Sequence, residues 1–423
     1  MKSLKDFLKV DLIVDNEVSP EFEISKILME NYRKTVLFNR VKGSRLRVAG
    51  NIITSRDRMC SALGTTREKF VMKVTESLKS PVEAEYVDKK PWQEEIKSLR
   101  ELPILRHFKK DAGAYITSGV VFARDEEHGR NASIHRMLVL DDNHIAIRLV
   151  ERHLHAFYTK KEEKNEALEI AIAIGLHPSV LFASSYSFNS FEDELALAGA
   201  LAGEPVTLAK CKSVDLRVPS EAEIVIEGKI LPGERTEEGP FIDITGTYDI
   251  VRKQPVIEVT KISVKRDAIY PALVPSSVEH RLLMGMPREP SIYHEVSKVA
   301  DVKNVVLSEG GCNWLHGFVS IKKRSEDEPE KAIEAAFEGH RSMKHVVIVD
   351  DDIDIFKPEE VEFAIATRFQ AHRDAHIFRN VKGSSLDPSA GRSAITTKVG
   401  IDATKPLGKE EEYEKAGIPE VKK

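Results

Sequence analysis

Alternating apolar and polar positions mark the middle of this chain as rich in strands. Ile224–Ile230 and Val256–Val264 alternate with the two-residue period of a half-buried strand. Short apolar runs, broken by Gly, Asp or Asn turns, continue from Tyr115 to Val150 and predict further strands. We interpret Lys164–Ile174 and Phe191–Leu201 as helices that interrupt them. The pattern therefore predicts a strand-rich core.

Helices and strands alternate on both sides of this core. In the first hundred residues, Phe22–Tyr32 and Arg67–Ser80 have helical patterns and Val36–Arg40 reads as a strand. A helical connector containing Pro287 and Pro290 leads into the last region. That region contains the predicted strands Val302–Leu307, Gly317–Lys322 and His345–Val349 and the predicted helices Glu330–Phe337 and Glu359–Phe369. Such alternation indicates an α/β lobe at each end.

Composition narrows the class of protein. The 423 residues carry a net charge of −5, with 41% apolar and 31% charged residues, which is ordinary for a globular protein and leaves no basic footprint for nucleic acid. No apolar run reaches the roughly eighteen residues that cross a bilayer. Met1–Asp6 lacks the apolar core of a signal peptide, so we expect a cytoplasmic protein without membrane insertion. Cys60, Cys211 and Cys312 have no metal-type spacing, which predicts free thiols.

The segment Glu238-Gly-Pro-Phe-Ile-Asp243 sets two carboxylates five residues apart around a Gly-Pro turn. Gly239 lets the backbone bend and Pro240 fixes it, so both acids can point into one cavity. Exclusion of water would raise the proton affinity of one acid, while a neighbouring cation would keep the other ionised. This arrangement suits proton transfer. A solvated acidic turn is the alternative interpretation of these six residues.

Two arginines lie about a hundred residues upstream of this turn. Arg136 and Arg148 are twelve residues apart across a predicted hairpin turn. A hairpin would bring both guanidinium groups near one face, where they suit a phosphate or a carboxylate. Both could instead be charges at a strand edge.

Asn131, His153 and Glu194 offer oxygen and nitrogen atoms that suit manganese or magnesium better than zinc. They are spread over more than sixty residues. Spacing alone therefore does not identify a metal site.

Many ordered blocks of the chain together resemble the UbiD-like decarboxylases that use prenylated FMN. The blocks are Asn131–Arg136, Arg148–Val150 with Arg152 and His153, Glu194–Gly199, Val214–Pro219, Glu221–Gly228, Glu238–Asp243 with Thr245 and Gly246, Val349–Ile355, Ala366–Arg368 and Gly400–Thr404. Within the family the chain looks most like the compact archaeal branch of anhydromevalonate phosphate decarboxylases, because it is short and rich in Lys and Glu.

The resemblance implies a fold of mixed α+β and α/β character around a split β-barrel like those of flavin reductases. The implied domains are an N-terminal α/β lobe (1–103), a split-barrel core that binds prenylated FMN (104–275), a connector helix (276–300), a C-terminal α/β oligomerisation lobe (301–395) and a tail (396–423).

The resemblance also implies a role for each site residue. Arg136, Glu238 and Asp243 match the family's acid-arginine-acid network, in which Arg136 holds Glu238 and Asp243 carries the working proton. Asp243 stands where some members have the longer Glu, a variation that occurs within the family. The implied metal ligands are Asn131, His153 and Glu194, for Mn²⁺ or another divalent ion, and a potassium ion is also allowed. The implied contacts to the prenylated FMN are Asn131, Ser133, Ile134, His135, Arg136, Arg148, Leu149, Val150, Arg152 and His153.

For an activity, the resemblance implies decarboxylation of an α,β-unsaturated acid. The expected reaction converts trans-anhydromevalonate 5-phosphate to isopentenyl phosphate and carbon dioxide, for isoprenoid synthesis. The substrate phosphate needs a cation, for which Arg281, Arg288 and Arg341 are open alternatives. One rival is an aromatic-acid decarboxylase of the 4-hydroxybenzoate or polyprenyl-hydroxybenzoate type. The other is a protein that binds flavin or metal without decarboxylase activity.

Two kinds of partner follow from the same resemblance. A separate flavin prenyltransferase is expected to supply the cofactor. The C-terminal lobe is expected to make the contacts of a homodimer or a larger homo-oligomer.

Overall fold

A computed structural model of the chain describes residues 2–188, 190–391, 393–414 and 416. It forms two compact units, Met1–Pro287 and Arg288–Lys423. The finer boundaries predicted at residues 103, 275, 300 and 395 stay predictions. Part of the predicted tail, residues 415 and 417–423, lies outside the described residues.

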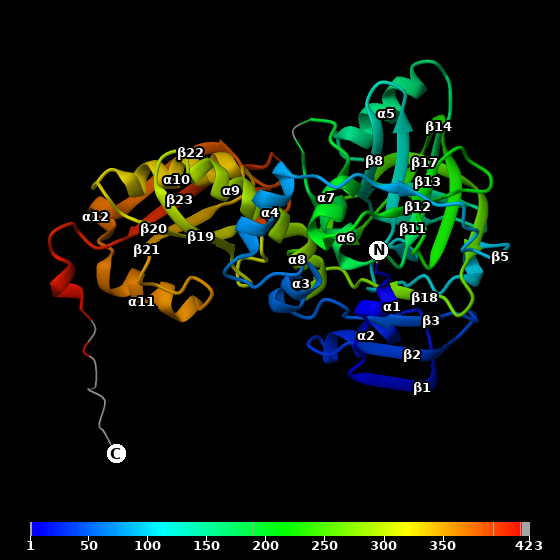
Figure 1. Cartoon of the computed structure of the whole chain (residues 1–423), viewed down its shortest axis with the longest axis horizontal. Helices are drawn as coiled ribbons and strands as arrows, with labels where there is room; N and C mark the ends of the chain where they lie inside the picture. Colours follow the sequence, from blue (N-terminus) through cyan, green and yellow to red (C-terminus); the bar gives the residue numbers. More distant parts are fainter. Residues whose placement is uncertain (1, 189, 392, 415, 417–423) are drawn as a thin grey trace. The chain divides into compact units, whose positions relative to one another are not determined.

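A four-stranded sheet begins the first unit (Figure 1). Its strands, in spatial order, are β1 (Leu12–Val18), β2 (Val36–Val41), β3 (Arg47–Gly50) and β18 (Ile269–Ala272). The accompanying helices are α1 (Leu4–Phe7), α2 (Glu23–Glu30), α3 (Arg56–Ala62) and α4 (Phe70–Lys79), so the predicted helices at Phe22–Tyr32 and Arg67–Ser80 are confirmed. β18 follows the central sheet in the sequence and pairs with β3. The early strands and the central sheet share one hydrophobic core.

The central sheet has nine strands. It contains β5 (Glu94–Ile96), β6 (Tyr115–Ile116), β7 (Val120–Asp125), β8 (Gly129–Ile134), β9 (Met137–Val139), β10 (His144–Ile147), β11 (Leu168–Ile174), β14 (Ile224–Glu238) and β17 (Arg252–Val264). The path runs β6-β9-β10-β17-β14-β11-β7-β8, with β5 beside β17. The predicted mixed α/β architecture is confirmed. Among the described residues the end strands β6 and β8 do not pair with one another, so the sheet does not close and the predicted split barrel is not confirmed.

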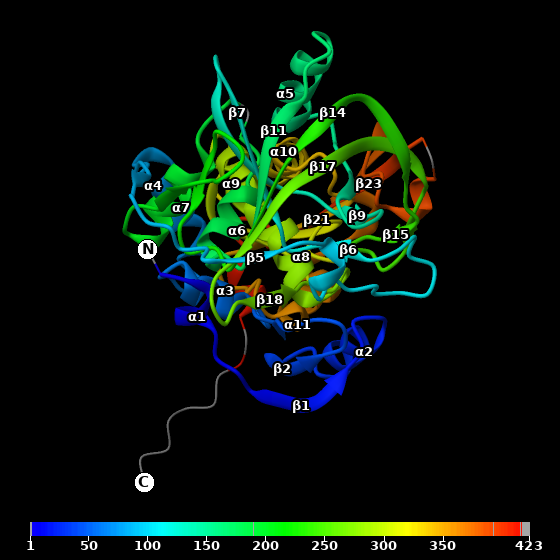
Figure 2. The same ribbon diagram turned by 90° about the vertical axis from the view of Figure 1, so that its right-hand side faces the viewer.

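The longest feature of this sheet is the antiparallel pair β14–β17 (Figure 2). The predicted strands Ile224–Ile230 and Val256–Val264 lie within it. Its register places Glu238, the last residue of β14, directly opposite Arg252, the first residue of β17. A short hairpin of β15 (Phe241–Ile242) and β16 (Tyr248–Asp249) connects the two strands. The acidic turn is therefore built at the end of the pair.

One predicted helix is wrong. Lys164–Ile174 contains the strand β11, which lies between β14 and β7. Ile170, Ile172 and Ile174 alternate with alanines, and all five side chains are buried because both faces of the strand are covered. β-Branched residues at a two-residue period favour a strand over a helix.

The remaining elements of the first unit cover this sheet or extend it. They are β4 (Glu85–Tyr86), α5 (His153–Glu162), α6 (Pro178–Ser185), α7 (Glu194–Ala202), β12 (Thr207–Lys210), β13 (Arg217–Pro219) and α8 (Val278–Gly285). The predicted helix Phe191–Leu201 is confirmed as α7.

The second unit is an α/β sheet of five strands in the order β19-β20-β21-β23-β22. Its strands are β19 (Asp301–Leu307), β20 (His316–Lys322), β21 (His345–Asp350), β22 (Ala375–Lys382) and β23 (Ile395–Ala403). Its helices are α9 (Glu289–Val296), α10 (Glu328–Gly339), α11 (Pro358–Arg368) and α12 (Ala371–Asp374). The strands and helices predicted between Val302 and Phe369 are confirmed. Across both units, no described helix is long and apolar enough to cross a membrane.

Candidate active site

A buried ion pair lies at the end of the β14–β17 pair. Arg136, between β8 and β9, donates from Nε to Glu238 Oε1 and from Nη2 to Glu238 Oε2, both at 2.9 Å. The Glu238 side chain is fully buried and that of Arg136 is 11% exposed. Two parallel hydrogen bonds between charged groups fix both the distance and the plane of the guanidinium. The structure thus brings together two of the three residues predicted for proton transfer.

Two aromatic residues complete the surroundings of this pair, and neither was predicted. The Tyr115 hydroxyl donates to Glu238 Oε1 at 3.1 Å and accepts from the Gly239 N–H at 3.2 Å. Burial raises the pKa of Tyr115, so its hydroxyl keeps the proton that it donates. The Arg136 guanidinium lies over the Phe241 ring, 5.2 Å from its centre. Apolar aromatic faces around the pair exclude water and strengthen its attraction.

Asp249 is a second carboxylate on Arg136 that sequence reasoning missed. Its Oδ2 accepts from Arg136 Nη2 at 3.1 Å and from Arg252 Nη1 at 2.6 Å. Burial raises the pKa of Asp249, but the bond from Arg252 and the charge of Arg136 outweigh it, and the net pKa is lowered. The Thr245-Gly246 turn in the sequence could have indicated this residue. A hairpin at that turn pairs Asp249 with Phe241 and so brings it next to the acidic segment.

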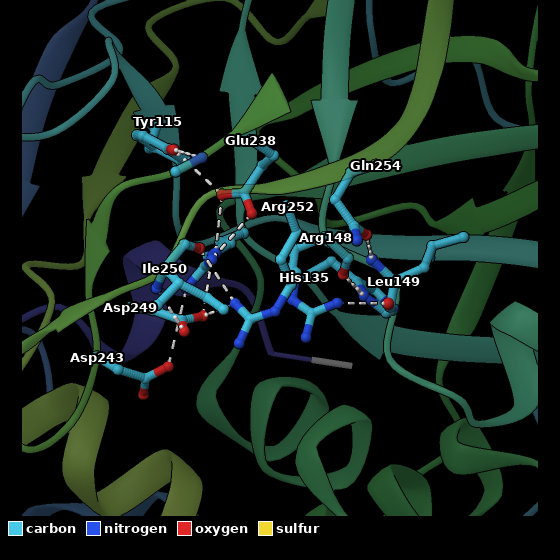
Figure 3. Close-up of polar contacts among 12 residues, drawn as sticks. Tyr115, His135, Arg148, Leu149, Glu238, Asp243, Asp249, Ile250, Arg252 and Gln254 are labelled. Carbon is cyan, nitrogen blue, oxygen red and sulfur yellow. Dashed lines mark hydrogen bonds and ion pairs between the residues drawn. The ribbon is translucent and has the colours of Figure 1, made fainter. Parts of the chain in front are cut away.

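Asp243 lies at the open side of the same cluster. Figure 3 shows Glu238, Asp243 and Asp249 directed toward one centre. Asp243 Oδ2 is 3.9 Å from Arg136 Nη1, too far for a hydrogen bond. Its Oδ1 accepts from the Ile244 N–H at 2.7 Å, and the side chain is 22% exposed. His280 of α8 is also near, because the charge of Asp243 raises its pKa against a larger lowering by burial. Asp243 is the least constrained acid of the three.

The segment predicted to bind the cofactor begins beside this cluster. The Arg148 N–H donates to the Arg136 carbonyl oxygen at 3.1 Å, which places the two arginines opposite one another as the hairpin predicted. Leu149 is buried and its N–H donates to Gln254 Oε1 at 2.8 Å, whereas Val150 is exposed.

Two arginines of this segment suit an anion. Arg148 donates to the Leu149 carbonyl and Arg152 to the Ser187 hydroxyl. In the described part of the chain, neither guanidinium contacts a carboxylate. Burial and the positive charges of Arg252 and Arg136 lower the pKa of Arg148, an electrostatic cost that a bound anion would relieve. This is the environment that a phosphate requires.

A chain of contacts from His135 to Asn131 suits a cation. Burial lowers the pKa of His135 to about 4, so the neutral ring carries one proton. That proton is on Nδ1, because the Arg148 carbonyl oxygen 3.0 Å away can only accept. His135 Nε2 and Asn131 Oδ1 both lie 2.9 Å from the Ser133 hydroxyl, which can donate its one proton to either of them.

Asn131 and Glu194 are in contact, as two members of the predicted metal set. Asn131 Nδ2 donates to Glu194 Oε1 at 2.8 Å, and the Ala132 N–H donates to Glu194 Oε2 at 2.9 Å. Both side chains are buried, and burial raises the pKa of Glu194 to about 8. Among the described residues Glu194 has no cationic partner, so a divalent ion would fit here.

His153, the third member, lies at the start of α5 and is not joined to the other two. Its ring packs against Phe191 with 4.5 Å between ring centres. It makes no hydrogen bond or ion pair with Asn131 or Glu194 in the described structure. Ile134, at the end of β8, is half-buried and lies in the sequence between Asn131 of the metal set and Arg136.

A separate acidic cluster lies at the β7–β8 turn. Asp125, Glu127 and His128 bring their ligand atoms within 4.8 Å of one another. Among the described His, Cys, Asp and Glu residues, this is the one group of three close enough to hold a metal ion. The Lys160 ammonium contacts Asp125 at 3.0 Å and Glu127 at 3.2 Å. A lysine therefore already balances this charge.

Three family models match the chain in succession. The N-terminal domain of 3-octaprenyl-4-hydroxybenzoate carboxy-lyase (UbiD) matches residues 12–78, its Rift-related domain matches 62–278, and its C-terminal domain matches 281–403. The Rift-related domain model covers Arg136, Glu238, Asp243 and Asp249.

Similar proteins span nearly the whole chain. Anhydromevalonate phosphate decarboxylase of Methanothermobacter thermautotrophicus is 45% identical over 412 residues, which is 97% of this chain and 97% of that protein. The UbiD-class enzyme HmfF of Pelotomaculum thermopropionicum, solved in complex with FMN, has a TM-score of 0.94 at 40% identity and covers 99% of this chain and 98% of its own. An evolved dimeric form of HmfF, in complex with prFMN, has a TM-score of 0.90 at 39% identity, with 99% and 97% covered.

Proposed function

We propose that this chain, which belongs to the UbiD family of carboxy-lyases, decarboxylates trans-anhydromevalonate 5-phosphate to isopentenyl phosphate and carbon dioxide. The observation that carries the proposal is the buried Arg136–Glu238 pair with Asp243 beside it but not hydrogen-bonded to it. The full-length likeness to an anhydromevalonate phosphate decarboxylase supports the choice of substrate.

In this proposal Asp243 is the proton donor. Loss of carbon dioxide leaves a carbon that must take up a proton, and a carboxyl group at the open side of the cluster can deliver it. Arg136 holds Glu238 in one orientation through two hydrogen bonds, and Tyr115 adds a third. A buried carboxylate held in one orientation can position the reacting group.

The cofactor in this proposal is prenylated FMN. When bound, it would accept the electron pair that carbon dioxide leaves on the substrate, which amino-acid side chains cannot do. Arg148 and Arg152 would hold its phosphate, since neither described guanidinium is paired with a carboxylate. The remaining proposed contacts are Asn131, Ser133, Ile134, His135, Arg136, Leu149, Val150 and His153. HmfF, a structural relative, binds FMN and prFMN.

A divalent ion, with manganese as the first choice, would share the phosphate with these arginines. Glu194 and Asn131 would be ligands through oxygen atoms, as their burial and contacts favour. His153 would join them by turning its ring away from Phe191. Potassium stays a proposed additional ion.

Arg281 is the best of the three cations considered for the substrate phosphate. It is half-buried in the same unit as Asp243 and donates to the Ile244 carbonyl oxygen at 3.0 Å, one residue beyond the acid. Arg341 instead pairs with Glu338 at 3.0 Å on an exposed surface of the second unit, and Arg288 lies over the Trp314 ring there. A cation beside the acid favours a phosphorylated substrate over the rival aromatic acid.

Three further features belong to the proposal. A flavin prenyltransferase would supply the cofactor, and the protein would act in the cytoplasm. It would assemble as a homodimer or larger homo-oligomer, as the dimeric form of HmfF illustrates for a relative.

The deciding experiment measures carbon dioxide release. The protein is produced together with a flavin prenyltransferase, matured in air, supplied with manganese, and given anhydromevalonate phosphate or 4-hydroxybenzoate in parallel. Release from the phosphate alone supports the proposal. Release from the aromatic acid alone supports the rival, and release from neither, with prenylated FMN confirmed by mass spectrometry, contradicts both.

A variant tests the role of Asp243. Asp243→Asn should retain the cofactor and lose roughly 100-fold or more in kcat, because the amide cannot give up a proton. Asp141→Asn, at an exposed turn, is the matched control and should keep its activity. Full turnover by Asp243→Asn would remove the donor assignment.

A further inference from the structure

The N–H groups of the Arg136 guanidinium differ in their partners: Nε and Nη2 are hydrogen-bonded to carboxylates, and Nη1 is not. Nε donates to Glu238, and the two hydrogens of Nη2 are taken by Glu238 at 2.9 Å and Asp249 at 3.1 Å. Nη1 has no hydrogen-bond acceptor among the described residues, and the nearest carboxylate oxygen is Asp243 Oδ2 at 3.9 Å. The second acid on the arginine is therefore Asp249 rather than Asp243.

Asp249 is itself held on both oxygens. Its Oδ2 is shared between Arg136 and Arg252, and its Oδ1 accepts from the Ile250 N–H at 2.8 Å. Its side chain is 16% exposed. Glu238, Arg136, Asp249 and Arg252 therefore form a charge-balanced chain of hydrogen-bonded ion pairs at the end of the β14–β17 pair. Such a chain has little freedom to rotate.

We propose that Asp249 is a positioning residue that, together with Glu238, holds Arg136 and so keeps Asp243 free to donate its proton. This inference rests on the proposed function, in which Asp243 is the donor. Asp243 lies only about 1 Å beyond hydrogen-bond distance of Nη1. Without Asp249, Arg252 loses its carboxylate and Arg136 keeps only Glu238, so Arg136 turns to Asp243, the acid within reach. A carboxylate bound in that way is a poor proton donor.

Asp249→Asn tests the role in the holoenzyme. The amide keeps the shape but not the charge, so kcat should fall by about 10-fold to 100-fold with little change in KM or in cofactor content. The solvent deuterium isotope effect on kcat should rise, because proton delivery becomes slower than the other steps. Asp249→Glu, which restores the charge, should recover part of the activity. A loss of kcat with an unchanged isotope effect, or no loss at all, would overturn the proposal.

Glu162→Gln is the matched control, since Glu162 also pairs with an arginine, Arg235 at 2.9 Å, in the same unit. It should leave both kcat and the isotope effect unchanged.

A second measurement does not depend on turnover. In the wild-type background, Asp243→Asn should lower the melting temperature little, since Asp243 makes no hydrogen bond to Arg136. In the Asp249→Asn background the same change should lower it clearly more, because Asp243 has become the partner of Arg136. Equal effects in the two backgrounds would contradict the exchange of partners, even if the wild-type protein proved inactive on the proposed substrate.

Discussion

Glu279, a buried carboxyl group at the start of α8, should make the stability of the first unit fall as pH rises. It accepts a hydrogen bond from the Ile52 N–H at 3.0 Å and is 4% exposed. Burial raises its pKa from 4.5 to about 7, against smaller opposing effects of backbone hydrogen bonds and the charge of Arg58. The folded protein therefore holds this proton more tightly than the unfolded chain does.

The sign and the size follow from this difference. Below about pH 4.5 Glu279 is protonated in both states, and its contribution to stability is complete. As pH rises toward 7 the unfolded chain releases the proton first, so the free energy of unfolding falls. At about 1.4 kcal/mol for each pH unit between the two pKa values, the loss reaches about 3 kcal/mol by pH 8.

Glu279→Gln imitates the protonated side chain at every pH. Between about pH 5 and pH 8 the variant should therefore gain about 2–3 kcal/mol in free energy of unfolding relative to the wild type, or about 4–5 °C in melting temperature for a unit of this size. Thermal unfolding followed by circular dichroism at both pH values measures the change. Any fixed cost of the amide cancels in the comparison.

Glu162→Gln provides a control in which the pKa of the carboxyl group is shifted in the opposite direction, downward. The bond from Arg235 lowers the pKa of Glu162 to about 2, so its contribution is complete above about pH 4.5 and is lost only in stronger acid. Its melting temperature should differ from that of the wild type equally at pH 5 and pH 8. If Glu279→Gln behaved in the same way, burial would not be controlling this proton.

Two further predictions concern the site. Glu238→Gln should lower the free energy of unfolding by about 3–5 kcal/mol, because it leaves the buried Arg136 without its main counter-charge. Thermal unfolding of the cofactor-free protein measures this loss. A change below about 1 kcal/mol would show that Asp249 alone can balance the charge of the arginine. Arg281→Gln should raise KM by about 10-fold or more for anhydromevalonate phosphate while leaving the dephosphorylated acid unaffected. Steady-state kinetics on both substrates decides this, and equal losses on the two would give Arg281 a structural role only.

Local pattern was sufficient wherever neighbouring residues share one environment. The period of two in Val256–Val264 and the helical pattern of Phe22–Tyr32 both predicted the observed element, because apolar residues recur in each with the period of that element. The strand at Leu168–Ile174 was missed because both of its faces are covered, so the contrast between apolar and polar positions is absent.

The sequence by itself determined which residues carry charge and chemistry: the acids around the Gly-Pro turn, Arg136, and the oxygen and nitrogen atoms of Asn131 and Glu194. Only the tertiary structure decided how they pair. The register of β14 and β17 brings Glu238 opposite Arg252, and the hairpin between them carries Asp249 to Arg136 at 3.1 Å while Asp243 stops at 3.9 Å. Hydrogen bonds depend on differences of less than 1 Å between residues far apart along the chain, and local sequence does not encode such distances.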